Sequence, residues 1–302
     1  MSNISFLDGP LPRDDSAARP SAGGPDESAA TVRLTILRAG ATHAPARLFG
    51  VDESWRRVEI PALFALIEHP RYGATLFDTG YSTRFFEATR GFPDRLYRWL
   101  TPVAIGADEN AGPQLARRGI PPEQIRWIVV SHFDPDHIGG LRDFPGARFV
   151  CSWRAWRAIA GKTGLAALRE RLLCGLLPDD FAARLHVLPD PHGPAIGPLG
   201  PSHDLFGDGS VLLVALPGHA PGMLGAVVAT DRGEQTLLCA DACWTRRTFE
   251  DPRRPAGVHP LLAKNRTAQR ETYRLLRRLR EEMPGVQIVP SHCPETFRSL
   301  QS

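Results

Sequence analysis

The stretch Ser131-His132-Phe133-Asp134-Pro135-Asp136-His137 holds two histidines and two aspartates within six residues. It directly follows Arg126-Trp-Ile-Val-Val130, an apolar run that predicts a buried strand. A loop at the end of a strand can point several side chains toward one place on a rigid scaffold. Imidazole and carboxylate groups together suit zinc, iron, manganese or cobalt, so the stretch predicts a metal site. Taken alone, it also fits a polar surface turn that begins at Asp134-Pro135.

Three later segments have the same form, an apolar strand that ends in a residue able to bind metal. They are Leu216-Pro-Gly-His219, Leu237-Leu-Cys-Ala-Asp241 and Val286-Gln-Ile-Val-Pro-Ser-His292. Each of these His and Asp residues by itself would more often be structural. Four strands with such an ending argue against coincidence, and we expect the four to share one site.

Together, these segments resemble the metallo-β-lactamase superfamily of metal-dependent hydrolases. The resemblance runs from about residue 32 to 295, in the order of the family's motifs. Leu76-Phe-Asp78-Thr79-Gly80 resembles the early DTG turn, and His132 to His137 resembles the HxHxDH signature. The fold that the resemblance implies is α/β (α+β), a four-layer αββα sandwich in which two mixed sheets pack face to face with helices outside.

The resemblance also implies a set of metal ligands and an orienting carboxylate. One ion would be held by His132, Asp134 and His219, a second by Asp136, His137 and His292, and Asp241 would bridge the two. Asp78 would orient a ligand through a hydrogen bond. The implied cofactor is two divalent metal ions, with zinc as the first choice.

Within the superfamily, Asp241-Ala-Cys-Trp244, Phe249-Glu-Asp251 and the closing helix most resemble the branch of N-acyl homoserine lactone lactonases. Asp134 departs from the pattern, because the signature usually has His there; a carboxylate is a harder ligand and shifts the preference toward iron or manganese. Trp244 stands where that branch has a tyrosine, and an indole N–H does not fully replace a phenolic hydroxyl. Trp244 and His259 are candidates for lining the substrate pocket.

The resemblance implies a hydrolase in which a metal-bound hydroxide cleaves the carbonyl of a lactone, ester, thioester or amide. Asp136 and Asp241 would be the catalytic carboxylates, and Asp136 would accept a proton as well as bind metal. Two alternatives stay open: a di-iron redox protein, and a single-metal or non-catalytic member of the fold. Against the redox protein, we expect no flavodoxin-like domain in the short segment that follows His292.

The 302 residues have a globular composition, with 42% hydrophobic residues and a net charge of +3. We expect residues 1–30, rich in Pro, Gly, Ser, Ala and Asp, to form a disordered tail. Residues 31–302 would form one domain, with a lid or insertion at about 161–205.

The small net charge and the short apolar runs predict a small-molecule substrate, with no nucleic-acid or membrane partner. Scattered cysteines and the absence of a secretory signal predict a cytoplasmic protein, while the sequence leaves its oligomeric state unknown.

Hydrophobic periodicity predicts the secondary structure that carries these motifs. Strands are expected at 31–37, 126–130, 148–151, 211–216 and 286–289, and hairpins at 64–77 and 224–239. Helices are expected over 82–100, 109–119, 153–160 and 267–283.

Overall fold

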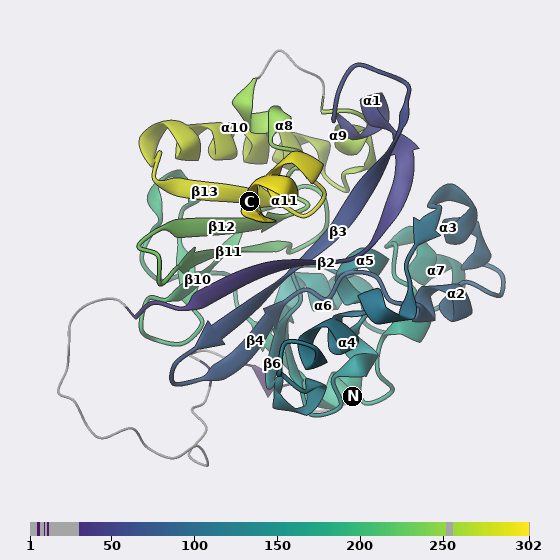
Figure 1. Cartoon of the computed structure of the whole chain (residues 1–302), viewed down its shortest axis with the longest axis horizontal. Helices are drawn as coiled ribbons and strands as arrows, with labels where there is room; N and C mark the ends of the chain where they lie inside the picture. Colours follow the sequence, from purple (N-terminus) through teal and green to yellow (C-terminus); the bar gives the residue numbers. More distant parts are fainter. Residues whose placement is uncertain (1–4, 7–8, 10, 12–29, 252–255, 302) are drawn as a thin grey trace.

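The computed structural model describes residues 5–6, 9, 11, 30–251 and 256–301. Figure 1 shows two β-sheets packed against each other, with helices on the two outer sides. The larger sheet has the strand order β1-β8-β7-β6-β4-β3-β2-β5, and the smaller sheet has the order β13-β12-β11-β10-β9. Both sheets contain parallel and antiparallel pairs. The expected sandwich of two mixed sheets between helices is therefore confirmed.

The elements have the following bounds. The larger sheet contains β1 (Ser5–Phe6), β2 (Arg33–Pro45), β3 (Arg57–His69), β4 (Gly73–Phe77), β5 (Val103–Ala104), β6 (Trp127–Val129), β7 (Arg148–Ser152) and β8 (Leu185–Leu188). The smaller sheet contains β9 (Ser202–Asp204), β10 (Val211–Ala215), β11 (Leu224–Ala229), β12 (Gln235–Ala240) and β13 (Val286–Pro290). The helices are α1 (Ala46–Phe49), α2 (Arg84–Ala88), α3 (Arg95–Leu100), α4 (Ala111–Ala116), α5 (Pro135–Ile138), α6 (Trp153–Ile159), α7 (Gly164–Arg169), α8 (Arg247–Glu250), α9 (His259–Leu262), α10 (Arg266–Glu282) and α11 (Pro294–Gln301).

Strand β3 shows how the larger sheet packs on both of its faces. Leu63, Ala65 and Ile67 belong to the core between the two sheets, while Phe64 and Leu66 belong to the core beneath the outer helices. This division follows from the strand itself, because successive side chains point to opposite faces. Since both faces are buried, the strand reads as a continuous apolar run rather than as an alternation of apolar and polar residues.

Helix α10 covers the outer side of the smaller sheet (Figure 1). Tyr273, Leu276 and Leu279 lie on one face of the helix and are buried in the same core as that sheet. The side chain of Asn265 caps the helix by accepting a hydrogen bond from the backbone N–H of Ala268 at 3.0 Å. The helix predicted over 267–283 is confirmed, with bounds shifted by one residue.

The helix expected over 82–100 is divided in two. Helix α2 ends at Ala88 and α3 begins at Arg95. The sequence Gly91-Phe92-Pro93 lies between them, and neither glycine nor proline favours a helix interior. The other predicted strands and helices are present, and most of their ends shift by a few residues; the exceptions are β2, which continues to Pro45, and β3, which begins at Arg57.

The tail expected over residues 1–30 lies mostly outside the described residues. Its described part differs from the expectation, since β1 pairs in parallel with β8 at the edge of the larger sheet. Leu11 is buried, and its backbone N–H donates to the carbonyl of Leu205 at 2.7 Å. The edge of β8 has backbone groups that a further strand can satisfy, which gives β1 its place in the sheet.

The segment expected as a lid or insertion, about 161–205, contributes to both sheets. It contains β8 and β9, which the sequence analysis did not predict. The part before β8 contains α7 and Arg171, and the side chain of Arg171 lies at the end of the sandwich where the predicted ligands gather. Among the described residues, no helix is both long enough and apolar enough to span a bilayer.

Candidate metal centre

The ends of five strands bring the seven predicted ligands and the orienting residue Asp78 to one end of the sandwich. Asp78 follows β4, the loop His132–His137 follows β6, His219 follows β10, Asp241 follows β12, and His292 follows β13. Three groups have ligand atoms within 4.8 Å of one another: His132, Asp134 and His219; His132, His137 and Asp241; and Asp136, His137 and His292. The structure thus brings all seven predicted ligands together, and all seven are buried.

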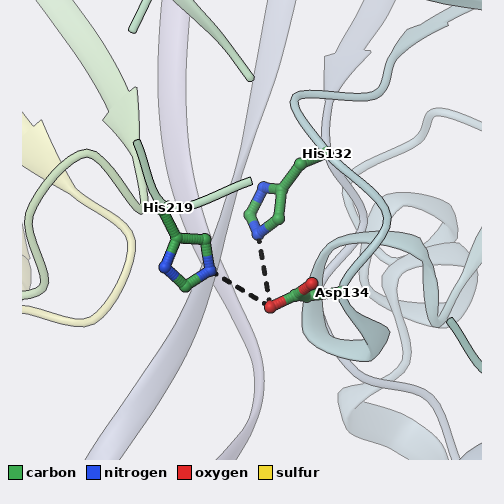
Figure 2. Close-up of side chains that lie close together, drawn as sticks. All are labelled: His132, Asp134 and His219. Atoms are coloured by element: carbon green, nitrogen blue, oxygen red, sulfur yellow. Dashed lines mark hydrogen bonds and ion pairs between the residues drawn. The ribbon is translucent and has the colours of Figure 1, made fainter. Parts of the chain in front are cut away.

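The group of His132, Asp134 and His219 is called the first group below. Figure 2 shows the carboxylate of Asp134 facing both imidazole rings. Oδ2 of Asp134 lies 3.7 Å from Nε2 of His132 and 3.1 Å from Nε2 of His219. Asp134 precedes the first residue of α5, Pro135, whose fixed φ suits the start of a helix. The turn into α5 therefore sets the direction of the Asp134 carboxylate.

Asp241 contacts both sides of the centre. Its Oδ1 lies 3.2 Å from Nε2 of His137 and 3.1 Å from Nε2 of His292. Its Oδ2 lies 3.5 Å from Nε2 of His219. On the far side, Oδ2 of Asp136 lies 3.2 Å from Nε2 of His292. Asp241 has the central position that a bridging ligand needs.

Three buried atoms at this centre have no hydrogen-bond partner within the described part of the chain. They are Nε2 of His132, Nε2 of His137 and Oδ1 of Asp241. Buried polar atoms are almost always satisfied, and leaving one unsatisfied costs about 1–3 kcal/mol. All three are atoms that bind divalent metals, and their residues form one of the three groups above. The residues present therefore fit a metal ion.

Asp78 orients His137 through the ring nitrogen that faces away from the centre, Nδ1. Its Oδ2 lies 2.7 Å from Nδ1 of His137 and accepts a hydrogen bond from the hydroxyl of Ser131, also at 2.7 Å. The backbone N–H of Ser131 donates to the other oxygen of Asp78 at 2.8 Å. A proton on Nδ1 of His137 leaves the lone pair of Nε2 directed into the centre, as a metal ligand requires. The orienting role expected for Asp78 agrees with this geometry.

The carboxylates make the centre strongly attractive to positive charge. Burial lowers the pKa of His292, but Asp241 and Asp136 outweigh it and raise this pKa to about 10. Burial likewise opposes the charge on His137, yet Asp78 and Asp241 hold its pKa well above the ordinary range. Burial raises the pKa of Asp241, while the two histidines bring it well below the usual value. A divalent cation would meet the same demand for positive charge.

Arg171 belongs to the centre, and sequence reasoning missed it. Its Nε donates a hydrogen bond to Oδ2 of Asp134 at 2.6 Å, and its Nη2 lies 3.0 Å from Nε2 of His219. Burial opposes the charge of Asp134, but Arg171 keeps the pKa of that carboxyl well below its usual range. Burial and Arg171 both lower the pKa of His219. No pattern in the sequence distinguishes this arginine from the many others in the chain.

Trp244 and His259 lie close behind the ligands. The side chain of Trp244 donates from Nε1 to Oδ2 of Asp241 at 2.9 Å, and its ring stacks on that of His259 with centroids 4.6 Å apart. His259 is fully buried, with Nε2 at 3.0 Å from Nδ1 of His219 and Nδ1 at 2.5 Å from the hydroxyl of Tyr273. The two residues thus support ligands directly, and their expected place in a substrate pocket stays a prediction.

A two-sheet sandwich with a His and Asp cluster at the ends of its core strands defines a class of metal-dependent hydrolases. The family model described as the metallo-beta-lactamase superfamily matches residues 61–292, well over half of the chain. The chain belongs to the metallo-beta-lactamase superfamily.

The chain is similar to several lactonases and metallo-hydrolases. N-acyl homoserine lactonase AttM of Azorhizobium caulinodans is 26% identical over 277 residues, 89% of this chain and 96% of AttM. Probable metallo-hydrolase Rv2300c of Mycobacterium tuberculosis is 31% identical over 244 residues, 75% of this chain and 73% of Rv2300c. A solved N-acyl homoserine lactone hydrolase, with N-hexanoyl-L-homoserine bound at its catalytic metal center, superposes with a TM-score of 0.65 at 18% identity, covering 89% of this chain and 96% of its own. The protein is a metal-dependent hydrolase near the lactonase branch of the superfamily.

Proposed function

We propose that the protein hydrolyses the carbonyl of a small lactone, ester, thioester or amide, with a lactone as the first candidate. The observation that carries the proposal is the set of three buried atoms, on His132, His137 and Asp241, that can bind a metal and make no hydrogen bond with the described residues. These residues would hold a divalent ion, which would supply Lewis acidity and a coordinated water whose pKa is lowered to about 7. The named lactonase relatives favour a lactone over the other carbonyl substrates and over the redox alternative.

We assign the catalytic carboxylates to Asp241 and Asp136. Asp241 lies between His137, His292 and His219, where its charge holds these three imidazoles around one point. The side chain of Asp136 is 11% exposed, more than that of any other predicted ligand. Asp136 is therefore the predicted ligand most open to solvent, which suits a carboxylate that accepts a proton.

The proposed metal is zinc, because four of the seven predicted ligands are imidazoles. Iron or manganese are the alternatives, since Asp134 supplies a hard oxygen ligand where the family signature usually has nitrogen. Another solved structure with a similar fold is described as a dizinc quorum-quenching lactonase, and it superposes on this chain with a TM-score of 0.58 at 15% identity. The expectation of two ions in this chain stays a prediction, as do the small-molecule substrate and the cytoplasmic location.

Reconstitution tests the proposal. Metal is removed with a chelator, zinc, manganese or ferrous iron is added back, and the protein is screened against N-acyl homoserine lactones, thioesters and aryl esters. We expect hydrolysis that disappears with the chelator and returns with zinc. Full turnover by the metal-free protein, or no turnover with any of these metals and substrates, would contradict it.

A further inference from the structure

The guanidinium of Arg171 lies within the first group. It donates from Nε to Oδ2 of Asp134 at 2.6 Å and places Nη2 at 3.0 Å from Nε2 of His219. Nδ1 of His219 lies 3.0 Å from Nε2 of His259. When Nδ1 of His219 carries the proton and donates it to His259, Nε2 of His219 has a free lone pair. This lone pair then accepts a hydrogen bond from Arg171. These two acceptor atoms are the ones that a metal in the first group would use. Arg171 and such an ion therefore compete for the same place.

Two further hydrogen bonds fix the guanidinium where it is. Nη1 of Arg171 donates to the carbonyl of Leu262 at 3.1 Å, and Nη2 donates to the carbonyl of His219 at 3.2 Å. The side chain is only 21% exposed, although arginine is a long residue that usually reaches into solvent. Residues of α9 and of the loop after β10 thus hold the positive charge in the centre from both sides.

The charges of Arg171 and Asp134 balance. Asp134 stands where the signature that this chain resembles usually has a neutral histidine, so it adds one negative charge to the first group. Arg171 adds one permanent positive charge, and a guanidinium matches a carboxylate well in geometry and charge. The first group therefore already contains a cation, whereas Nε2 of His132 and Nε2 of His137 make no hydrogen bond with any described residue.

The backbone of Arg171 has an unusual conformation. Its φ is 62°, in the left-handed region that a side chain with a Cβ disfavours. Arg171 is the second residue after α7, where the backbone N–H of Arg171 donates to the carbonyl of Leu168 at 2.9 Å and that of Leu172 donates to the carbonyl of Ala167 at 3.1 Å. This pair of bonds ends a helix with a left-handed residue, so the end of α7 fixes the place from which the side chain of Arg171 reaches Asp134 and His219.

We propose that the guanidinium of Arg171 takes the place of a metal ion between Asp134 and His219, so that the chain binds one divalent ion. That ion would be held by His132, His137 and Asp241, with Asp136 and His292 beside them. The inference rests on the proposed metal-dependent function and concerns how the centre is built. Arg171 then supplies permanent positive charge next to the one ion, available to an oxyanion or carboxylate of the substrate.

The test is the number of zinc ions per chain. Metal-free protein is incubated with excess zinc, freed of unbound metal by gel filtration and analysed by plasma mass spectrometry. We expect one ion in the wild-type protein and two in Arg171→Gly, because the variant frees Asp134 and His219. Glycine adopts a positive φ without strain, so this variant keeps the backbone path. Arg169→Ala, at an exposed residue of the same segment, is the matched control and should bind one ion.

The outcomes separate this inference from the proposed function. Two ions in the wild-type protein would overturn the inference and leave a metal-dependent hydrolase. One ion in both the wild-type protein and Arg171→Gly would also overturn it, because Arg171 would then exclude nothing. No ion in the wild-type protein would overturn the proposed function itself. If Arg171→Gly does not fold, titration of the wild-type protein with Co²⁺ gives the decision: absorption that saturates at one equivalent supports the inference, and saturation at two refutes it.

Discussion

Trp244 donates a hydrogen bond from Nε1 to Oδ2 of Asp241 at 2.9 Å. The other oxygen of that carboxylate lies within 3.2 Å of Nε2 of both His137 and His292. The indole ring stacks on Phe49, with centroids 4.3 Å apart, and is 7% exposed. Trp244 therefore holds the carboxylate at the middle of the centre in one orientation.

Trp244→Phe keeps an aromatic ring for stacking and removes the N–H donor. We expect the affinity for zinc to fall about 10-fold, within the range typical of lost partners behind metal ligands. The measurement is competition for zinc against a chromophoric chelator. Trp99→Phe, at a largely exposed tryptophan, is the control and should change nothing. Unaltered zinc affinity in Trp244→Phe would show that the hydrogen bond does not orient Asp241 toward metal.

Asp241→Asn keeps the size of the side chain and removes its charge. Because Asp241 contacts His137, His219 and His292, we expect kcat/KM to fall about 10³-fold or more, equivalent to several kcal/mol of lost transition-state stabilisation. Kinetics with the best substrate from the reconstitution screen give the value. Asp231→Asn, at an exposed carboxylate, should retain wild-type kinetics. Unchanged turnover in Asp241→Asn would refute the central role of this residue.

Asp78→Asn tests the support behind His137. The variant weakens the contact to Nδ1 of His137, and the ring then loses the partner that directs Nε2 into the centre. We expect zinc affinity to fall about 10- to 100-fold. Ser131→Ala removes only the hydroxyl that donates to Asp78, so it should have the smaller effect of the two. Equal effects from the two variants would contradict the proposed orientation of His137 by Asp78.

Asp134→His tests the pair of Asp134 and Arg171 in the absence of metal. The variant restores the histidine of the family signature but leaves a largely buried guanidinium without its carboxylate. We expect a loss of about 1–3 kcal/mol in the free energy of unfolding, below the cost of a fully buried pair because Arg171 is 21% exposed. Urea denaturation with a chelator present gives the value. In the Arg171→Gly background the same change should cost less, and an equal loss there would show that the pair is not coupled.

The strand ends could be predicted because their sequence is local. Each of the runs before Ser131, His219, Asp241 and His292 is apolar, and each stops at a polar residue. A buried strand has both faces covered, so the apolar run and its end reveal the strand without knowledge of its neighbours. The ligands follow directly, and the structure brings all of them together.

Arg171 and β8 could not be predicted in the same way, because their roles depend on distant partners. Arg171 contacts Asp134 and His219, which lie 37 and 48 residues away in the sequence. Strand β8 contributes only Leu185–Leu188, and its parallel neighbours determine its place in the sheet. The buried position of His259 likewise depends on Tyr273 and His219 rather than on local pattern.

A buried histidine outside the metal centre makes the stability of the fold depend on pH. His69, at the end of β3, has its side chain fully buried and accepts at Nδ1 from the backbone N–H groups of Arg71 and Tyr72, at 2.9 and 3.2 Å. Its Nε2 lies 2.8 Å from Oδ2 of Asp208, which is in the loop before β10. Burial lowers the pKa of His69, and Asp208 only partly offsets this. A second proton would also remove the acceptor that the two backbone groups share.

The sign of the effect follows from the direction of that shift. The pKa of His69 is lower in the folded state than its ordinary value of 6.5, so the unfolded chain binds more protons as the pH falls. We expect the stabilisation from His69 to be fully present above about pH 7.5 and to decrease below pH 6.5, by at most about 1.4 kcal/mol per pH unit. The measurement is the difference in unfolding free energy between the wild-type protein and His69→Asn, with a chelator present, from pH 5 to 8. Taking the difference cancels the other histidines, among them His137 and His292, whose raised pKa values act in the opposite direction. His192→Asn, at an exposed histidine, should show no such trend. A difference between wild type and His69→Asn that stays constant over this range would show that His69 is not held neutral by the fold.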